Sequence, residues 1–169
     1  MARSRSRFGS RPAARPSRML PLLVAALGFG AVGAALVSQY VFDMLPCPWC
    51  TFQRLLFLVI ALLALLCALL QRGWFARIMA ALGMLACAGG VASALWQHFV
   101  AAKSASCAMT FADRVMNTLG LFTLSPEVFA PQANCADAAV NLLGLPYEFY
   151  SLALYLLCAA LLALVIRRA

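Results

Sequence analysis

The sequence predicts an all-α membrane protein, built as a four-helix transmembrane bundle with one short and one long periplasmic loop. Its 169 residues are 65% hydrophobic and only 11% charged, and the mean hydropathy is +0.93, which lies outside the usual range of soluble domains. The apolar residues also gather in four runs, each close to the roughly 20 residues that cross a hydrocarbon core of about 30 Å. We therefore expect one membrane domain.

The predicted membrane domain covers residues 19–166, and a basic tail precedes it. Its spans are expected at about 19–42, 51–70, 78–100 and 149–166, with loops at about 43–50 and 101–148. The first run exceeds the 7–15 apolar residues of a secretory signal, so we expect it to be retained. Residues 1–18 combine Arg, Ser, Pro and Gly and are expected to be disordered. In the long loop, Ser125-Pro126-Glu127 predicts the start of a short helix.

The distribution of charge orients the predicted spans. Six arginines lie in the first eighteen residues, two in the turn at 71–77 and two at the C-terminus, and these segments contain no acidic residue. Because the cytoplasmic loops of membrane proteins carry an excess of Lys and Arg, both termini are expected in the cytoplasm. Topology thus explains the net charge of +8, and no aromatic-interleaved basic surface indicates nucleic-acid binding.

The seven cysteines divide into two groups by their surroundings. Three fall inside apolar spans and are expected to be small packing residues, namely Cys67, Cys87 and Cys158. Four fall on the predicted extracytoplasmic side, namely Cys47, Cys50, Cys107 and Cys135. Paired thiols in an oxidising compartment become disulfides, so these four are the candidate catalytic residues.

Cys47-Pro48-Trp49-Cys50 forms a C-x-x-C motif, the spacing at which two thiols close a small ring that opens and shuts by thiol–disulfide exchange. A zinc site would need four ligands, and the other two cysteines are 28 positions apart, so no metal is predicted. Taken alone, Cys107 and Cys135 would also fit an inert structural disulfide. Cys50 immediately precedes the predicted second helix, whose N-terminal amides stabilise a thiolate.

Arg54 and His98 are the predicted ligand-binding residues beside this motif. On a helix, Arg54 lies four residues after Cys50 on roughly the same face and about 6 Å deeper in the membrane. A buried arginine costs about 2.5–3.5 kcal/mol at the centre of a membrane and less near its surface, which suggests a site there. His98 is expected at a similar depth, where both side chains can donate hydrogen bonds to one ligand.

Taken in order, these features resemble the DsbB family of membrane quinone reductases, which form disulfide bonds. The resemblance rests on the stretch from Cys47 to Arg54, on His98, on Cys107 and Cys135, and on Leu143-Gly144-Leu145-Pro146 before the fourth span. It covers the chain from about residue 19 and says nothing of the basic tail.

The resemblance implies an electron relay in the bacterial inner membrane. A reduced periplasmic thioredoxin-like protein of the DsbA type would attack a Cys107–Cys135 disulfide, and Cys135 would then exchange with Cys47. The freed Cys50 thiolate would meet a quinone, either ubiquinone or menaquinone, held near Arg54 and His98.

Two other interpretations stay open. A vitamin K epoxide reductase-like protein also combines a helix bundle with a C-x-x-C and a loop cysteine pair, although there the loop pair precedes the C-x-x-C. A non-enzymatic membrane scaffold with a disulfide-stapled loop leaves Arg54 beside Cys50 unexplained.

Overall fold

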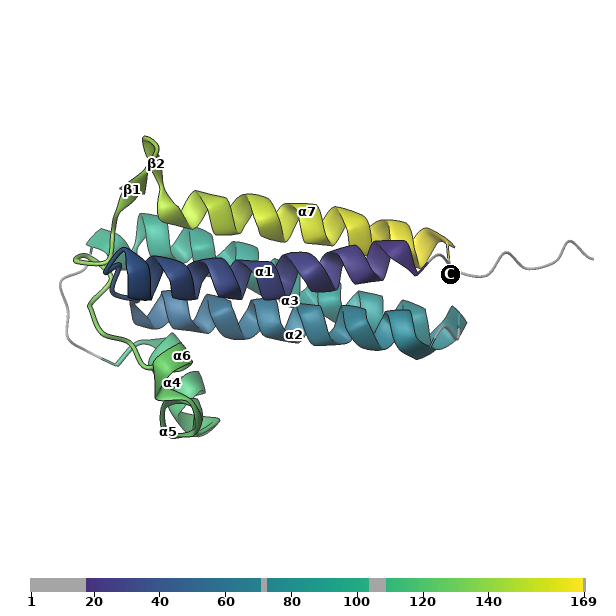
Figure 1. Ribbon diagram of the computed structural model, residues 1–169, viewed down its shortest axis with the longest axis horizontal. Coiled ribbons are helices and arrows are strands. Elements are labelled where there is room, and N and C mark those ends of the chain that lie inside the picture. Colours follow the sequence, from purple (N-terminus) through teal and green to yellow (C-terminus); the bar gives the residue numbers. More distant parts are fainter. Residues whose placement is uncertain (1–17, 71–72, 104–108, 169) are drawn as a thin grey trace, which may run out of the picture.

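The structure is a computed structural model that describes residues 18–70, 73–103 and 109–168. Within these ranges four long helices form a bundle (Figure 1): α1 (Met19–Val41), α2 (Pro48–Leu70), α3 (Gly73–Phe99) and α7 (Tyr147–Arg168). The predicted four-helix fold is confirmed. Predictions for Cys107, residues 1–17 and the Gln71-Arg72 turn lie outside the described residues.

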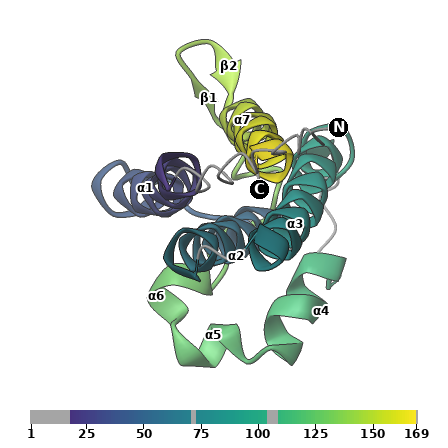
Figure 2. The same ribbon diagram turned by 90° about the vertical axis from the view of Figure 1, so that its right-hand side faces the viewer.

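The four long helices pack in a ring of neighbours. Helix α2 packs against α1 and α3, and α7 closes the ring by packing against α3 and α1. The view along the bundle shows this arrangement, with the start of α1 and the end of α7 at the same end (Figure 2). The short loop elements lie at the opposite end of the bundle (Figure 1).

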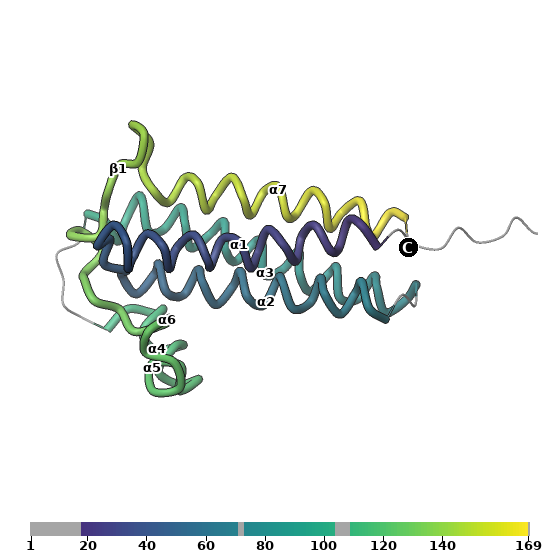
Figure 3. Tube along the Cα trace, viewed as in Figure 1, coloured from purple at the N-terminus to yellow at the C-terminus, as the bar shows by residue number. Residues whose placement is uncertain are grey.

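Short elements occupy the end of the bundle opposite the C-terminus (Figure 3). They are a 3₁₀ turn (Ala101–Lys103), α4 (Phe111–Thr118), α5 (Leu121–Leu124), α6 (Pro126–Phe129), and an antiparallel hairpin of β1 (Asn141–Leu142) and β2 (Leu145–Pro146). The helix expected after Ser125 is α6, with Pro126 in its first turn. Helix α4 was not predicted; Thr110 and Asp113 start it with a reciprocal capping box.

The long helices extend past the predicted spans at several ends. Helix α2 begins at Pro48 instead of about 51, and α3 begins at Gly73 instead of about 78. The added residues are polar, aromatic or conformationally special, so an apolar window excludes them although they still make helical hydrogen bonds.

The outer surface of the bundle is apolar. Large side chains such as Leu66, Leu85 and Leu156 are 43%, 70% and 56% exposed, which would be unfavourable in water. In the described part of the chain, four helices are long and apolar enough to cross a membrane by length and composition. The exposed leucines are therefore the surface that faces lipid.

An aromatic pair fixes the centre of the bundle. The rings of Phe57 on α2 and Tyr155 on α7 stack with centroids 4.1 Å apart, and the Tyr155 hydroxyl donates to the Gln53 carbonyl at 2.9 Å. Gly90 on α3 leaves room for the Tyr155 ring, because a Cβ at that position would collide with it. A residue without a side chain is thus required where α3 passes α7.

Gly90→Ala should therefore destabilise the bundle by about 1–3 kcal/mol, since it forces the Tyr155 ring away from both partners. Gly89→Ala, one residue earlier on the same helix, is the matched control because a Cβ there meets no atom within 4 Å. Thermal unfolding of both variants in one detergent checks this; equal midpoints would contradict the packing described.

Candidate functional site

The C-x-x-C motif forms the N-terminus of α2. Pro48 takes the first helical position, where its missing N–H costs nothing, and the Cys47 carbonyl accepts the first helical bond from Thr51 N at 3.0 Å. The Cys47 sulfur also accepts a hydrogen bond from Cys50 N at 3.2 Å, so it acts as a side-chain cap. Cys50 thus lies inside the first turn and not before the helix as predicted. The two free thiols are 2.7 Å apart.

Cys135 lies against this motif although it comes from the long loop. The loop is held there by Gln132 N, which donates to the Pro46 carbonyl at 2.9 Å. Cys135 is 7% exposed and packs in one buried cluster with Cys47 and Trp49. Three of the four predicted catalytic cysteines therefore meet in one place, and the fourth, Cys107, lies outside the described residues.

The pKa values of Cys47 and Cys135 shift in opposite directions. Burial raises the pKa of the Cys47 thiol well above its ordinary value, and the hydrogen bonds to Cys135 and Cys50 add to the shift. The hydrogen bond from Cys47 lowers the pKa of Cys135, against the opposing effect of burial. Of this pair, Cys135 is therefore the more acidic thiol.

Arg54 lies deep in the same region, 6% exposed, and joins three segments. Its Nη1 donates to Gln39 Oε1 on α1 at 2.7 Å and to the Val128 carbonyl on α6 at 2.8 Å, and its Nη2 donates to the Ala35 carbonyl at 3.3 Å. These bonds use three of the five guanidinium N–H groups, so two remain without a partner among the described residues. The side chain has donors left for a ligand.

A cavity of about 290 Å³ adjoins Arg54. Cys50 and Arg54 both line it, and most other lining side chains are apolar, including Ala31, Phe57 and Leu154. Apolar walls with a few placed polar groups are typical of a site for a small organic molecule. Arg54, the predicted ligand-binding arginine, and Cys50 of the C-x-x-C motif thus line the same cavity.

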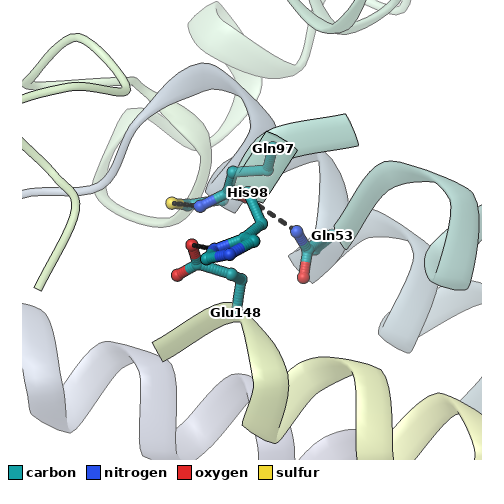
Figure 4. Close-up of polar contacts among 5 residues, drawn as sticks. Gln53, Gln97, His98 and Glu148 are labelled. Carbon is teal, nitrogen blue, oxygen red and sulfur yellow. Dashed lines mark hydrogen bonds and ion pairs between the residues drawn. The ribbon is translucent and has the colours of Figure 1, made fainter. Parts of the chain in front are cut away.

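Buried glutamines complete the site and were not predicted. Gln53 Nε2 donates to Gln97 Oε1 at 2.8 Å, and Gln97 Nε2 donates to the Cys50 sulfur at 3.4 Å (Figure 4). Gln39, which accepts from Arg54, is also buried. A polar amide within an apolar span is costly unless partnered, and this signal in the sequence could have identified these residues.

His98 is not among the residues that line the cavity. Its Nδ1 lies 2.9 Å from Glu148 Oε1 at the start of α7, and Glu148 does line the cavity (Figure 4). The structure therefore brings His98 near the predicted site through Glu148, a residue that sequence reasoning passed over. Direct contact between His98 and a ligand stays a prediction.

A bundle of four membrane-length helices, with thiols that can exchange clustered at one end beside a ligand-sized cavity, defines a multi-pass membrane protein of the thiol oxidoreductase class. The chain belongs to the DsbB family: the family model described as Disulfide bond formation protein DsbB matches residues 17–165. It is therefore a bacterial membrane protein with an oxidoreductase role in disulfide bond formation.

Curated relatives agree with this assignment. Disulfide bond formation protein B of Cupriavidus metallidurans is 35% identical over 154 residues, which are 90% of this chain and 94% of the relative. The protein of that name from Ralstonia nicotianae is 33% identical and covers 90% of this chain and 96% of its own length. Disulfide bond formation protein B 2 of Pseudomonas aeruginosa is 33% identical, with 83% and 85% covered.

The shifted acidities predict a pH dependence of alkylation. In the reduced protein, the rate at which iodoacetamide alkylates Cys135 should rise with pH. An ordinary thiol has the midpoint of this rise at about pH 8.5. The midpoint of Cys135 should lie lower, because a hydrogen bond from Cys47 lowers its pKa. Cys47→Ala removes that donor and should move the midpoint upward. Peptide mass spectrometry at a series of pH values measures this midpoint. The burial of Cys135 lowers the maximal alkylation rate but does not move the midpoint.

Cys67→Ala, which changes a buried thiol remote from the motif, is the control and should leave the Cys135 midpoint where it was. A midpoint that is the same with and without Cys47 would contradict the hydrogen bond.

Proposed function

We propose that this protein is a thiol:quinone oxidoreductase of the bacterial inner membrane that reoxidises a periplasmic DsbA-like dithiol protein. Electrons enter at Cys107 and Cys135, pass to Cys47 and Cys50, and leave to a membrane quinone. The observation that carries the proposal is the meeting of Cys135 with the C-x-x-C motif, which itself borders the cavity lined by Arg54.

The thiol contacts support a defined order of exchange. Attack on a disulfide needs a thiolate, and the pKa of Cys135 is lowered at the position where it touches Cys47. When Cys135 attacks Cys47 of an oxidised motif, the Cys47–Cys50 bond breaks and a Cys47–Cys135 bond forms. The electron pair of the broken bond then rests on the sulfur of Cys50, in the wall of the cavity.

The cavity suits a quinone headgroup. A bound quinone would supply a two-electron acceptor with two carbonyl oxygens, which need hydrogen-bond donors in a mostly apolar surrounding. Arg54 has two N–H groups left to donate, and the Gln53–Gln97 pair orients Gln97 toward the Cys50 sulfur. Arg54 would hold the ligand and stabilise the negative charge that develops on it.

Energetics explain why a quinone would be needed. DsbA itself, whose relay with DsbB and quinone is a well-known system, has a reduction potential of about −120 mV, whereas oxidising glutathione pools lie at about −180 to −210 mV. Passing two electrons from the first to the second is uphill by about 3–4 kcal/mol. An acceptor of higher potential that dissolves in the membrane removes this obstacle.

Family membership favours this function over the two alternatives. The vitamin K epoxide reductase-like interpretation is disfavoured, because the chain matches the DsbB family model over residues 17–165. A stapled scaffold would leave the thiols of Cys47, Cys50 and Cys135 without a use, and it differs from the proposal in a measurable way.

Purified protein given a reduced DsbA-type partner and a soluble quinone should oxidise the thiols of the partner and reduce the quinone. Cys50→Ser should abolish quinone reduction but retain partner exchange, whereas Cys107→Ser should lose exchange with the partner. Cys67→Ala should behave like the parent because that thiol lies in the bundle core. Absorbance of the quinone and trapping of free thiols measure the two steps; a parent protein inactive in both would indicate a scaffold.

Arg54→Ala should raise the apparent KM for quinone by about 10- to 100-fold. This corresponds to the roughly 1.5–3 kcal/mol of a hydrogen bond from a charged donor. Arg114→Ala, which removes an exposed arginine on α4, is the matched control for a lost charge. Steady-state kinetics at saturating partner check it, and an unchanged KM would remove Arg54 from the quinone site.

A further inference from the structure

Glu148 is a buried acid that the thiol relay does not use. It lies in the first turn of α7, is 5% exposed, and lines the same cavity as Cys50 and Arg54. Burying a carboxyl group in an apolar region is costly unless the group is partnered or neutral. Its partner is His98 on α3, at 2.9 Å.

The Glu148–His98 pair connects the cavity to the outside of the bundle. The side chain of His98 is 30% exposed, whereas that of Glu148 is 6% exposed. The two groups therefore form a short hydrogen-bonded line (Figure 4), with the partly exposed His98 at one end and Glu148, which lines the cavity, at the other.

The proposed reaction leaves one proton unaccounted for. When both cysteines of the motif are reduced, a Cys47 thiol and a Cys50 thiolate become a disulfide, which releases two electrons and one proton. Reducing a quinone to quinol takes up two electrons and two protons. The second proton has to come from another group that reaches the cavity.

We propose that Glu148 supplies this second proton and that His98 returns a proton to Glu148 from the aqueous side. This inference rests on the proposed function and adds a proton donor to it. In the overall step the sulfur–sulfur bond forms, the electron pair and two protons pass to the quinone, and one solvent proton refills Glu148 through His98.

Few other groups near Glu148 can donate a proton. The titratable or charged side chains facing it are His98 on α3, Cys50 and Arg54 on α2, and Tyr147 and Tyr150 on α7, and the described residues of α1 and β1 that line the cavity add none. Arginine is effectively always protonated. The Tyr150 hydroxyl already donates to the Leu142 carbonyl at 2.7 Å. Tyr147 is left as the rival donor.

The test compares Glu148→Gln with Tyr147→Phe in single-turnover reduction of quinone by the prereduced protein. Glutamine keeps the size of Glu148 and a hydrogen bond to His98 but carries no acidic proton. We expect Glu148→Gln to slow the step by about 10²-fold or more and to flatten its pH profile. Glu148→Asp should restore part of the rate, and Tyr147→Phe should change little.

His98→Gln separates refilling from donation. It should leave the first turnover closer to the parent rate and slow the later ones, because only repeated turnover requires Glu148 to regain a proton. Equal slowing of first and later turnovers would overturn the part of the proposal that concerns His98.

Redox-difference infrared spectroscopy gives a readout that is independent of turnover. The parent protein should show the C=O stretch of a protonated carboxyl that changes when quinone is reduced, and Glu148→Gln should lack it. A parent spectrum without this signal, or a slow step in Tyr147→Phe with none in Glu148→Gln, would overturn the role of Glu148. The parent spectrum decides this point even if the glutamine variant folds poorly.

Failure of the proposed function is distinguishable from failure of this inference. A parent protein that reduces no quinone refutes the function itself. A parent that reduces quinone normally while Glu148→Gln keeps its rate and pH profile refutes only the proton donor. Thiol exchange with the partner in the absence of quinone should be the same in Glu148→Gln and the parent.

Discussion

The hydrogen bonds of one buried guanidinium determine how the long loop meets the bundle. A charged side chain in an apolar helix is tolerated only if acceptors surround it. Arg54 on α2 obtains them from Gln39 and Ala35 on α1 and from the Val128 carbonyl on α6. The loop helix is therefore tied to the same side chain that lines the cavity, and Tyr40 adds a second bond to α6 through the Glu127 carbonyl at 2.8 Å. Arg54 therefore links the wall of the cavity to the position of the loop.

The N-terminus of α2 is the second constraint. Pro48 is the first residue of the helix, where a backbone N–H group would have no helical partner. The sulfur of Cys47 accepts a hydrogen bond from Cys50 N, so Cys47 caps the helix. The helix dipole then favours negative charge at the first turn, where Cys50 lies. The same local geometry that starts the helix also brings the two sulfurs to 2.7 Å.

The sequence alone was sufficient to predict the four helices, because spans of about 20 apolar residues and a one-sided arginine distribution are strong signals. It also singled out Cys47, Cys50, Cys135 and Arg54, which the structure brings together. It did not predict that Glu148 and Gln97 join them. Those residues come from helices far apart in the chain, and their partnership depends on how α3 and α7 pack, which no local pattern encodes. Helix α4 was missed although its Thr110 and Asp113 capping signal was present.

Burial gives the proposed relay its direction. Cys47 is completely buried, so a small soluble thiol has poor access to its sulfur, whereas Cys135 already touches it. Thiol–disulfide exchange depends on access and on the thiolate character of the attacking group, and both favour Cys135. Cys50 is the leaving group of that attack, and it alone of the three lines the cavity. In the proposed relay, electrons arriving from the loop therefore pass through Cys47 to Cys50 at the cavity wall.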